Sequence, residues 1–414
     1  MNKAQYMREI YLGGTQGVAP PFTTSTGKLL EEQAKEKLTP EAYGYVAGGA
    51  SSETTIANNR KALDDWRIVP SMLGGVDVSS FDSSVTLFGK TYPTPLVICP
   101  IGVHSQLNKE EADIATARAA SSLGVPFTLS SAGDRSIEEV QSAVEFDEEE
   151  EGNEAWYQLY WPSDDKLTES LLTRAKKAGY KALVVTLDTW ALGWRPRDLD
   201  TAYNPFLRGQ GIAQLASDPY FIETYCDGKD PRRSDITKEE ILQVSATAVS
   251  LLNPGISRSW AELPLLRKIW GDERPILLKG IQSVADARRA LDDTESRIDG
   301  IWVSNHGGRQ VDGAIGALQA LPAISNLCRQ RGKTVIFDSG IRTGSDVIKA
   351  LALGAHAVGI GRPYAYGLGI GGSEGVSNVL RGILADMELN AALCGCKSVK
   401  EIGRDMLVRS GEKL

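Results

Sequence analysis

GIWVSNHGGRQ (Gly300–Gln310), together with the two units that follow it, decides the fold. Those units begin at TVIFDSGIRT (Thr334–Thr343) and AVGIGRP (Ala357–Pro363). Each starts with a short apolar run and continues into a polar turn that contains glycine, and an amphipathic stretch (Ser345–Leu353) separates the last two. Continuous apolar strands that alternate with helices are typical of a parallel sheet covered by helices.

The same pattern extends toward the N-terminus. The strand-like runs number eight in all: Leu96–Cys99, Phe127–Ser130, Tyr157–Tyr160, Ala182–Leu187, Ile276–Lys279, Gly300–Ser304, Thr334–Asp338 and Ala357–Ile360. Helix-like stretches lie between most of them, for example at Glu110–Leu123, Lys166–Ala178 and Ser283–Leu291. Eight strand–helix units indicate a closed barrel rather than an open sheet. The sequence therefore predicts an α/β protein with the (β/α)8, or TIM-barrel, fold.

Two segments fall outside these units. Residues 1–80 contain a predicted helix (Gly27–Lys37) and a glycine-rich turn (Tyr45–Ala50), and we interpret them as a helical cap on the barrel. Between the fourth and fifth runs, residues 201–260 fit no strand–helix unit and become helical near Lys238–Leu252. Long insertions after barrel strands often cover the active site as lids. We therefore expect one domain, with a cap at 1–80 and a barrel at 81–414 that carries a lid at about 201–260.

Composition argues against several classes of partner. The net charge is −8, from 45 basic and 53 acidic residues, whereas nucleic acid or an anionic membrane requires a basic surface. The five cysteines are odd in number and form no zinc-type pair, so we expect free thiols and no metal site. No signal-like or membrane-length apolar segment is present, which favours the cytoplasm. Glu412–Leu414 is only partly similar to a peroxisomal tripeptide. The acidic run Glu145–Glu154 predicts a solvated surface loop.

Charged side chains follow four consecutive strand runs, at the carboxyl ends where barrel enzymes place their chemistry. They are Lys279, His306 and Arg309, Asp338 and Arg342, and Arg362. His306 lies three residues before Arg309, so an imidazole that takes a proton and a guanidinium that holds a carboxylate are expected to act on one substrate. Of the other two histidines, we expect His104 to line the wall of the pocket and His356 to be structural.

The loops after the seventh and eighth runs, Asp338–Arg342 and Gly359–Arg362, combine glycine with arginine. Barrels commonly bind phosphate at these two loops, which predicts the phosphate of a mononucleotide cofactor. The glycine-rich run Gly367–Gly372 does not predict a dinucleotide site, because it follows no strand directly. Lys279 leaves two alternatives open, a Schiff-base lysine or a fixed cation beside a cofactor.

Taken together, these motifs resemble the FMN-dependent α-hydroxy-acid oxidase family, with SNHGGRQ (Ser304–Gln310) as the most specific segment. The likeness extends from about Tyr43 to the C-terminus, and within the family it is strongest to the lactate 2-monooxygenase branch. The other matching segments are Tyr43–Ala50 (YGYVAGGA), Pro100–Val103 (PIGV), Leu187–Leu199 (LDTWALGWRPRDL), Pro205–Gly209 (PFLRG), Leu278–Gln282 (LKGIQ) and Phe337–Thr343 (FDSGIRT).

The resemblance implies a role for each matching residue. Those implied to be catalytic are His306 as the base, Asp188 as its carboxylate partner, Tyr160 and Arg309. Those implied to bind the substrate are Tyr45, Gly102, Tyr160, Arg195, His306 and Arg309, with the two arginines on its carboxylate. Those implied to bind FMN are Ser130, Gln158, Thr186, Lys279, Ser304, Asp338, Ser339, Gly340, Arg342, Gly361 and Arg362. Among them Lys279 is implied to lie against the flavin ring, which favours the fixed cation.

The implied reaction is the oxidation of a small L-2-hydroxy acid, such as lactate, to its 2-keto acid. His306 takes a proton while two electrons reach FMN, either as a hydride or through a carbanion. With O2, a keto acid that is released leaves an oxidase that makes H2O2, whereas one that is retained is decarboxylated, so that lactate gives acetate, CO2 and water. Gly102 stands where the family's oxidases usually carry alanine, which favours the monooxygenase outcome.

The resemblance also implies a homo-oligomer, a tetramer or higher, and it leaves the size of the substrate open. Gly102 and Ala132 are small enough to leave room for larger acids, and the lid region around Asp218–Ile256 matches only weakly. A dehydrogenase that passes electrons to a haem or a membrane quinone would need a haem domain or a membrane-binding insertion, and the sequence shows neither. A flavin-binding protein without activity would not need the complete set of His, Arg, Tyr and Lys.

Overall fold

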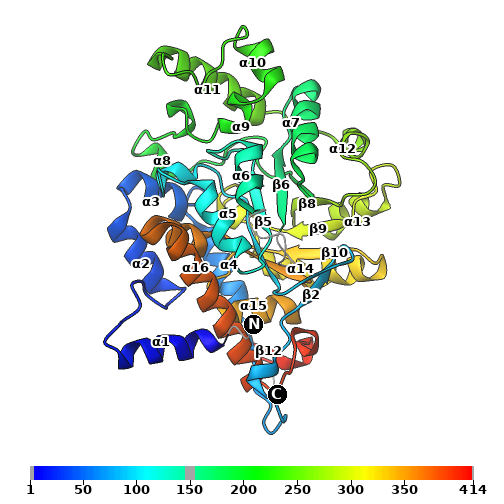
Figure 1. Cartoon of the computed structure of the whole chain (residues 1–414). Helices are drawn as coiled ribbons and strands as arrows, with labels where there is room; N and C mark the ends of the chain where they lie inside the picture. Colours follow the sequence, from blue (N-terminus) through cyan, green and yellow to red (C-terminus); the bar gives the residue numbers. More distant parts are fainter. Residues whose placement is uncertain (1–3, 145–153, 413–414) are drawn as a thin grey trace.

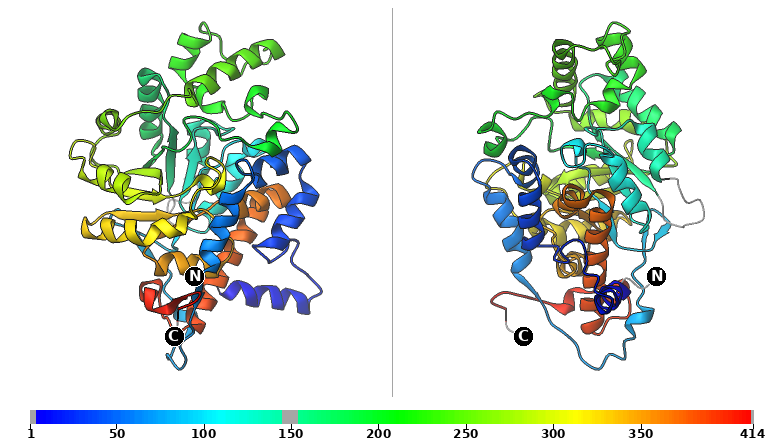
Figure 2. Two further views of the ribbon diagram at one scale, coloured as in Figure 1. Left: turned by 180° about the vertical axis from the view of Figure 1, so that it is seen from behind. Right: turned by 60° about the vertical axis from the view of Figure 1, so that its left-hand side comes forward.

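The computed structural model describes residues 4–144 and 154–412 and contains a closed barrel of parallel strands (Figures 1 and 2). The strands follow one another around the barrel in chain order: β4 (Leu96–Ile98), β5 (Phe127–Ser130), β6 (Ala155–Tyr160), β7 (Leu183–Thr186), β8 (Ile276–Ile281), β9 (Gly300–Val303), β10 (Thr334–Phe337) and β11 (Ala357–Ile360). β11 closes the barrel against β4, with Gly359 opposite Val97. The predicted TIM barrel is confirmed, because strands covered on both faces leave continuous apolar runs in the sequence.

A helix follows each barrel strand on the outside. In chain order these helices are α5 (Asp113–Ser121), α6 (Ile137–Val144), α7 (Asp165–Ala178), α12 (Leu263–Trp270), α13 (Val284–Asp292), α14 (Ala317–Gln330), α15 (Gly344–Ala352) and α16 (Arg362–Leu393). Local chemistry sets their ends, as in α7. The Asp164 side chain accepts hydrogen bonds from the first turn of α7, and Gly179, at φ +105°, ends the helix.

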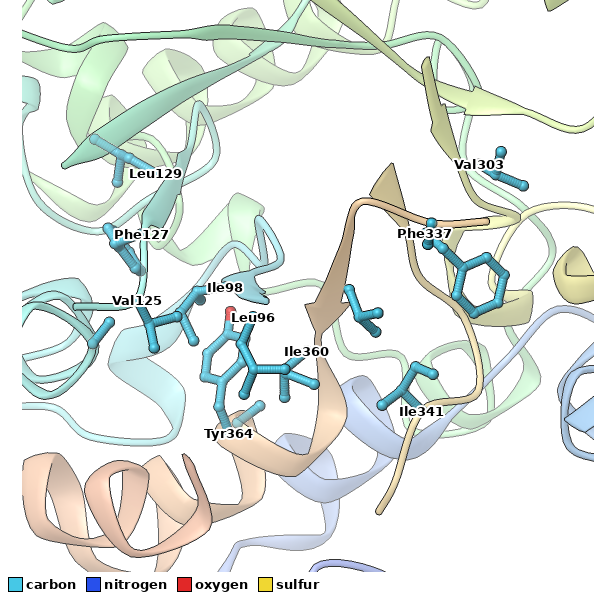
Figure 3. Close-up of a cluster of buried hydrophobic side chains, with 14 of the residues drawn as sticks. Leu96, Ile98, Val125, Phe127, Leu129, Val303, Phe337, Ile341, Ile360 and Tyr364 are labelled. Atoms are coloured by element: carbon cyan, nitrogen blue, oxygen red, sulfur yellow. The ribbon is translucent and has the colours of Figure 1, made fainter. Parts of the chain in front are cut away.

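Apolar side chains form one core between strands and helices and another inside the barrel. In the outer core, Ile98 and Phe127 pack near Tyr364 of α16 (Figure 3). Inside the barrel, Trp156 and Trp302 are fully buried and meet edge to face, with ring centroids 6.5 Å apart. These large rings help to fill the barrel interior, so the barrel has a packed core instead of a channel.

The hairpin of β2 (Val85–Leu87) and β3 (Lys90–Tyr92) packs on the inner core through Leu87 and Tyr92. Beside it, the buried carboxylate of Glu154 accepts hydrogen bonds from the Tyr92 hydroxyl and, at 2.7 Å, from Lys90 Nζ. The prediction of a solvated acidic run is therefore wrong for its last residue, because the hairpin supplies buried partners for that carboxylate. The remainder of the run, residues 145–153, lies outside the described residues.

The N-terminal segment contains more helix than its sequence predicts. Its helices are α1 (Gln5–Thr15), α2 (Lys28–Lys37), α3 (Pro40–Ala47) and α4 (Thr54–Asp64). Beyond α4, β1 (Trp66–Ile68) pairs antiparallel with β12 (Leu407–Arg409) near the C-terminus, with Trp66 opposite Arg409. Short 3-10 turns accompany these segments at η1 (Val78–Ser80), η6 (Val399–Glu401) and η7 (Arg404–Met406).

The glycine-rich run Gly367–Gly372 lies within α16, at a kink formed by Gly371 and Gly372. A Cβ atom on Gly371 would meet the Phe22 ring at 2.3 Å, so the absence of a side chain lets the N-terminal segment pack closely on α16. α16 is long, at 32 residues. Even so, no helix within 4–144 and 154–412 combines the length and the apolar character needed to cross a membrane.

The insertion after β7 contains α8 (Pro196–Leu199), η3 (Phe206–Arg208), α9 (Ala213–Ala216), α10 (Pro219–Tyr225), α11 (Lys238–Leu252) and η4 (Trp260–Glu262). Helices α10 and α11 lie at the top of Figure 1, near α7. Side chains fasten the insertion to the barrel loops. Asp134 accepts a hydrogen bond from Gly211 N at 2.6 Å, and the Gln214 amide donates to Ser130 O at 2.5 Å. In this structure the insertion is therefore anchored to the barrel.

Candidate active site

A cavity lies at the carboxyl ends of the barrel strands, with about 1130 Å3 of empty space that is partly open to solvent. Barrel enzymes bind their substrates at this end. Thirteen residues singled out from the sequence line it: Tyr45, Gly102, Tyr160, Arg195, Lys279, His306, Arg309, Asp338, Ser339, Gly340, Arg342, Gly361 and Arg362. The barrel topology brings these residues together from the N-terminal segment, the insertion and the loops after several strands. The cavity is therefore our candidate active site.

Five other residues from the sequence analysis do not line this cavity. Asp188 lies behind His306, and Ser130, Gln158, Thr186 and Ser304 are buried in the barrel mouth. Their polar groups bond to neighbouring protein groups. The Gln158 amide donates to the Thr186 hydroxyl at 2.9 Å, and the Ser304 hydroxyl donates to Asp338 at 2.6 Å.

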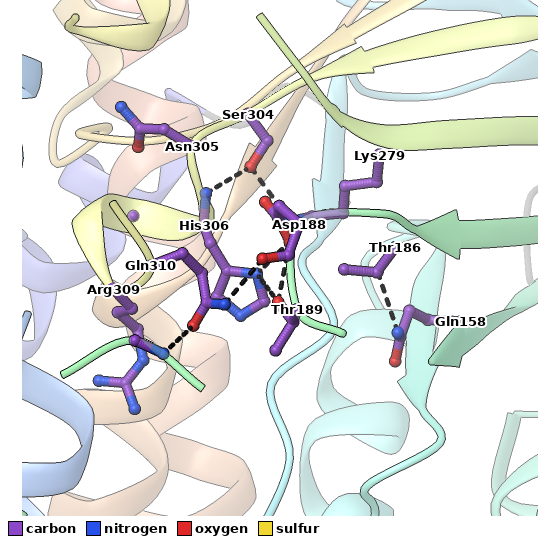
Figure 4. A network of polar contacts seen from close by, with 12 residues as sticks. Gln158, Thr186, Asp188, Thr189, Lys279, Ser304, Asn305, His306, Arg309 and Gln310 are labelled. Atoms are coloured by element: carbon purple, nitrogen blue, oxygen red, sulfur yellow. Dashed lines mark hydrogen bonds and ion pairs between the residues drawn. The ribbon is translucent and has the colours of Figure 1, made fainter. Parts of the chain in front are cut away.

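His306 and Asp188 form a close pair at the cavity wall (Figure 4). His306 Nδ1 is 2.9 Å from Asp188 Oδ1 and 3.0 Å from the Thr189 hydroxyl, which itself donates to Asp188 at 2.9 Å. Because Nδ1 donates its proton to the carboxylate, Nε2 is the nitrogen left to accept one. The Tyr160 ring stacks on the imidazole, with centroids 6.4 Å apart.

The two members of this pair have opposite protonation preferences. Burial raises the pKa of Asp188, but the neighbouring positive charges and hydrogen bonds outweigh it and hold that pKa at about 2. Burial lowers the pKa of His306, and nearby Lys279 and Arg195 act in the same direction, whereas Asp188 opposes them. The result at neutral pH is an anionic Asp188 beside a neutral His306, which is the state that a general base requires.

The loop that carries His306 adopts an uncommon backbone conformation. His306, Gly307 and Gly308 all have positive φ, at +57°, +63° and +80°. The Ser339 hydroxyl accepts hydrogen bonds from the backbone N–H of Asn305 and of Gly307. The Asn305 side chain also exchanges a pair of hydrogen bonds, at 2.7 and 2.8 Å, with Asn59 of α4. These contacts hold a strained loop at a fixed place.

Two arginines line the cavity together with His306, Arg195 buried and Arg309 partly exposed. Arg195 donates through Nε to Arg309 O at 3.2 Å, and Arg309 donates to the backbone oxygens of Tyr45 and Gly48. Neither forms an ion pair with a carboxylate among the described residues. Burial and the charge of Arg309 lower the pKa of Arg195 to about 10, which leaves it cationic at neutral pH. Asp198 attracts both charges without forming an ion pair with either, so the two guanidiniums at one wall still form a site for an anion.

Lys279 lies deeper in the cavity, 3.4 Å from Asp338 and 3.1 Å from the Ser304 hydroxyl. Burial opposes its charge, but Asp338 and Asp188 raise the pKa of Lys279 above its usual value, so the amine stays protonated. A Schiff base requires a neutral amine, and this environment therefore favours the fixed-cation alternative.

Arg342 and Arg362, from the loops after β10 and β11, also line the cavity. Neither pairs with a carboxylate within residues 4–144 and 154–412. Arg362 donates to three backbone oxygens, those of Val46, Gly48 and Gly307, at 2.8 to 2.9 Å. It therefore joins the N-terminal segment to the barrel, and it keeps free N–H groups for an anion.

Several residues of the insertion that line the cavity were not predicted from the sequence. Phe206, Ile212, Val249, Leu252 and Asn253 reach the cavity from the insertion. The last three lie at the end of α11 with spacings of three and four residues, so the helical periodicity of that segment was a signal for a shared face.

The surroundings of Gly102 differ from the sequence expectation. A Cβ atom on Gly102 would meet Ala132 O at 2.6 Å and Ala132 Cβ at 2.8 Å. The absent side chain therefore allows the loops after β4 and β5 to touch, with Val103 N donating to Ala132 O at 3.0 Å. The expectation that these two small residues leave extra room for substrate is wrong on this point, because they occupy each other's space.

The remaining histidines have structural environments. His104 does not line the cavity, so its prediction as a wall residue is wrong. The left-handed turn at Val103 precedes it, and its ring is fully buried, 3.2 Å from the Tyr364 hydroxyl and from Asp113. His356 Nδ1 accepts a hydrogen bond from Val335 N at 3.0 Å, as a structural histidine should.

The strand ends of this barrel present a neutral histidine, its carboxylate partner and several arginines that form no ion pair within the described residues. Such a site is that of an enzyme that handles anionic ligands. A family model described as FMN-dependent dehydrogenase matches residues 34–409. The chain therefore belongs to the FMN-dependent dehydrogenase family.

Individual relatives cover nearly the whole chain. It is 43% identical to an FMN-dependent alpha-hydroxy acid dehydrogenase of Penicillium citrinum, over 99% of this chain and 96% of that protein. It is 37% identical to an L-lactate oxidase of Lysinibacillus sphaericus, over 92% of each. A crystal structure of mandelate oxidase superposes with a TM-score of 0.75 at 31% identity, covering 94% of this chain and 98% of that one.

The cavity fits the FMN that this family uses. Arg342 and Arg362 supply positive charge for a phosphate, and the glycines beside them leave backbone N–H groups accessible. A Cβ atom on Gly361 would meet nothing nearer than Cys99 Cβ at 3.9 Å, so the chain is open at this point. Lys279 supplies a protonated amine at the cavity wall.

Proposed function

We propose that this enzyme oxidises L-lactate and, with O2, converts it to acetate, CO2 and water. Oxidation of a 2-hydroxy acid with FMN is the activity of the family, and the choice of lactate and of decarboxylation is our proposal. The observation that carries it is the neutral His306, paired with Asp188 at 2.9 Å, beside two arginines that have no carboxylate partner in the described chain. A small 2-hydroxy acid supplies both the anion and the proton that this arrangement can receive.

In the proposed mechanism, Arg195 and Arg309 bind the carboxylate and so fix the carbon that carries the hydroxyl. Burial raises the pKa of Tyr160, so its hydroxyl stays protonated and can donate a hydrogen bond to the substrate. His306 takes the substrate proton at Nε2, and Asp188 stabilises the imidazolium that forms. FMN, when bound, supplies the acceptor for the two electrons. Asp338, Ser339, Gly340, Arg342, Gly361 and Arg362 would hold its ribityl and phosphate end, and Lys279 would place a positive charge beside the ring.

The fate of the keto acid depends on how long it stays in the cavity. The anchored insertion supports retention, because Asp134 and Gln214 fasten it to the barrel loops that line the site. Retention favours decarboxylation. Gly102 supports the same outcome, but not by leaving extra room for substrate. Its loop contacts Ala132 directly, so the gap between the two loops is narrow.

A second candidate function is an oxidase that releases pyruvate and H2O2. It is favoured by the relatives named L-lactate oxidase and 2-hydroxyacid oxidase, of which the latter, from Dictyostelium discoideum, is 35% identical to this chain.

Aerobic turnover of L-lactate by the FMN-loaded protein, with acetate, pyruvate, H2O2 and O2 quantified together, tests the proposal. Acetate equal to the oxygen consumed, with little peroxide, is the expected result. Equal pyruvate and H2O2 would establish the oxidase instead. In Gly102→Ala the new methyl pushes against Ala132, and we expect a larger share of pyruvate and H2O2 than in the unaltered enzyme.

Gly280 provides a test of the His306–Asp188 pair. It has φ +102°, and a Cβ atom there would lie 2.9 Å from the Asp188 carboxylate. In Gly280→Ala, we expect the displaced carboxylate to lower kcat about 100-fold, as a misplacement of roughly 1 Å can. Steady-state kinetics with lactate measure this. Gly332→Ala is the control, because Gly332 also has positive φ (+61°) but no atom within 4 Å of the added Cβ. Equal turnover by the two variants would contradict the expected role of Asp188.

The pH dependence follows from the lowered pKa of His306. A base acts when it is deprotonated, and a lowered pKa keeps it so further into acid. We therefore expect kcat/KM to stay constant through neutral pH and to fall only below the ordinary value of 6.5. Because Asp188 raises this pKa, Asp188→Asn is expected to move the midpoint lower still. A midpoint above 6.5 in the unaltered enzyme would contradict this assignment.

A further inference from the structure

Gln310 lies directly after Arg309, on the loop after β9, and its side chain bonds to the loop after β7 (Figure 4). Its Oε1 accepts hydrogen bonds from Arg195 Nη2 at 2.7 Å and from Gly193 N at 3.3 Å. Its Nε2 donates to Asp188 O at 2.7 Å and to Ala191 O at 2.8 Å. One side chain thus contacts four points within eight residues of the neighbouring loop.

This set of contacts uses the full capacity of an amide, which has two N–H donors and two lone pairs on its oxygen. It also fixes the orientation of the group. A flipped amide would turn its N–H2 toward the donors Arg195 and Gly193, and its oxygen toward two carbonyl oxygens. No other side chain of this size offers both functions, since glutamate lacks the donors and lysine lacks the acceptors.

The backbones of the two loops also touch, which is an independent sign that their spacing is set here. A Cβ atom on Gly193 would lie 2.5 Å from Arg309 O and 2.7 Å from Gln310 O. Arg195 Nε, in addition, donates to Arg309 O at 3.2 Å. Only a residue without a side chain at 193 allows the loops to come this close.

The residues tied to Gln310 are the ones that the proposed reaction depends on. At one end of the amide is Arg195, a buried cation with no carboxylate partner in the described chain, whose place is set by Gln310 and by Arg309 O. At the other end is the backbone of Asp188, whose side chain holds His306 at 2.9 Å. Arg195 gives one N–H to each of its two protein partners and keeps three of its five for a ligand.

We propose that Gln310 is a positioning residue that sets the distance between the carboxylate-binding arginine and the carboxylate that orients the base. This inference rests on the proposed function, because it takes Arg195 and His306 to act on the same 2-hydroxy acid. Gln310 itself is expected to contact neither the substrate carboxylate nor the proton that His306 takes. It acts by making one rigid unit of the two loops, so that the bound acid arrives within reach of His306.

The test compares Gln310→Met and Gln310→Glu with the unaltered holoenzyme. Methionine keeps the length of the side chain and removes all four hydrogen bonds. Glutamate keeps the acceptors, loses both donors and places a negative charge against Arg195. Gln319→Met is the matched control: it is the same chemical change in the same strand–helix unit, at a residue that only accepts a hydrogen bond from Gly316 N.

The first readout is the binding of propionate, a carboxylate that cannot be oxidised at a hydroxyl, followed by calorimetry. We expect Gln310→Met to bind propionate about tenfold more weakly. The loss of roughly one charge-assisted hydrogen bond between Arg195 and the ligand corresponds to that change in affinity. Gln310→Glu is expected to bind it more weakly still, because its own carboxylate competes for Arg195. The second readout is the pH midpoint of kcat/KM, which we expect to fall in Gln310→Met as Asp188 moves away from His306.

A purely structural role would lower the melting temperature and leave both readouts unchanged, and that result overturns the proposal. If the methionine variant does not fold, the glutamate variant decides: weaker propionate binding supports the proposal, and equal binding overturns it. If the unaltered enzyme itself fails to bind propionate, the carboxylate site and the proposed function are wrong, and the role of Gln310 falls with them.

Discussion

His306→Gln is expected to lower kcat for lactate by about 1000-fold while the protein remains folded and yellow. Proton transfer by a well-placed side chain contributes on the order of 100- to 10,000-fold to a rate, and glutamine has no nitrogen that accepts a proton at neutral pH. Its amide can still donate to Asp188, so the pair does not leave an unpartnered carboxylate. The measurement is the rate at which lactate bleaches the flavin in the absence of oxygen, followed in a stopped-flow instrument.

The matched control for this change is His356→Gln. His356 accepts one backbone hydrogen bond, from Val335 N, and lies outside the cavity, so the same substitution there should leave the bleaching rate within a factor of about two. Nearly normal bleaching in His306→Gln would show that another group takes the proton.

Arg195→Met is expected to reduce kcat/KM for lactate by about 100-fold or more, mainly through KM. Removal of one partner of a buried pair of opposite charges weakens binding by roughly 2–5 kcal/mol. Methionine removes the charge of Arg195 but keeps most of the length and the apolar stem of its side chain. Steady-state kinetics with lactate and with lactamide separate charge from shape. Because lactamide carries no charge for Arg195 to bind, its kcat/KM should change much less.

Arg197→Met serves as the control for Arg195→Met. Arg197 is two residues away in α8, is half exposed, and pairs with Glu53 at 2.6 Å instead of lining the cavity. We expect its removal to leave KM for lactate nearly unchanged. An equal loss in both variants, or an equal loss with lactate and lactamide, would contradict the assignment of Arg195 to the substrate carboxylate.

The sequence predicted the barrel well because buried parallel strands leave a simple signal. Each of the eight strands appears as an apolar run, and the polar residues that interrupt the pattern mark the strand ends. Lys279 and His306 stand out for that reason, as does the arginine in each of the last two loops. Once the strands are arranged in a barrel, these residues must share one face, so this charged part of the cavity wall could be anticipated from chain order, whereas Tyr45, Tyr160 and Arg195 came from the family resemblance.

The parts that were missed depend on contacts between segments far apart in the chain. Nothing near Asn59 indicates that its amide pairs with Asn305, and nothing near Gln310 indicates that its amide bridges to Asp188 and Arg195. Glu154 looks like the end of a solvated run until the hairpin supplies its partners. The size of Gly102 suggested empty space, whereas Ala132 fills it. Close approach of two loops is a property of the tertiary structure, and single-residue patterns do not encode it.

The pairing of β1 with β12 has a consequence for how the protein is made. Trp66 is opposite Arg409, so the partner of β1 is synthesised more than 300 residues after it. At roughly 5–20 residues per second, a ribosome needs about 20–70 s to span the interval. Throughout that time the nascent chain carries a strand with an open edge, and the barrel itself cannot close until β11 emerges to meet β4. Chaperones that shield nascent strands therefore have a long interval in which to act on this chain.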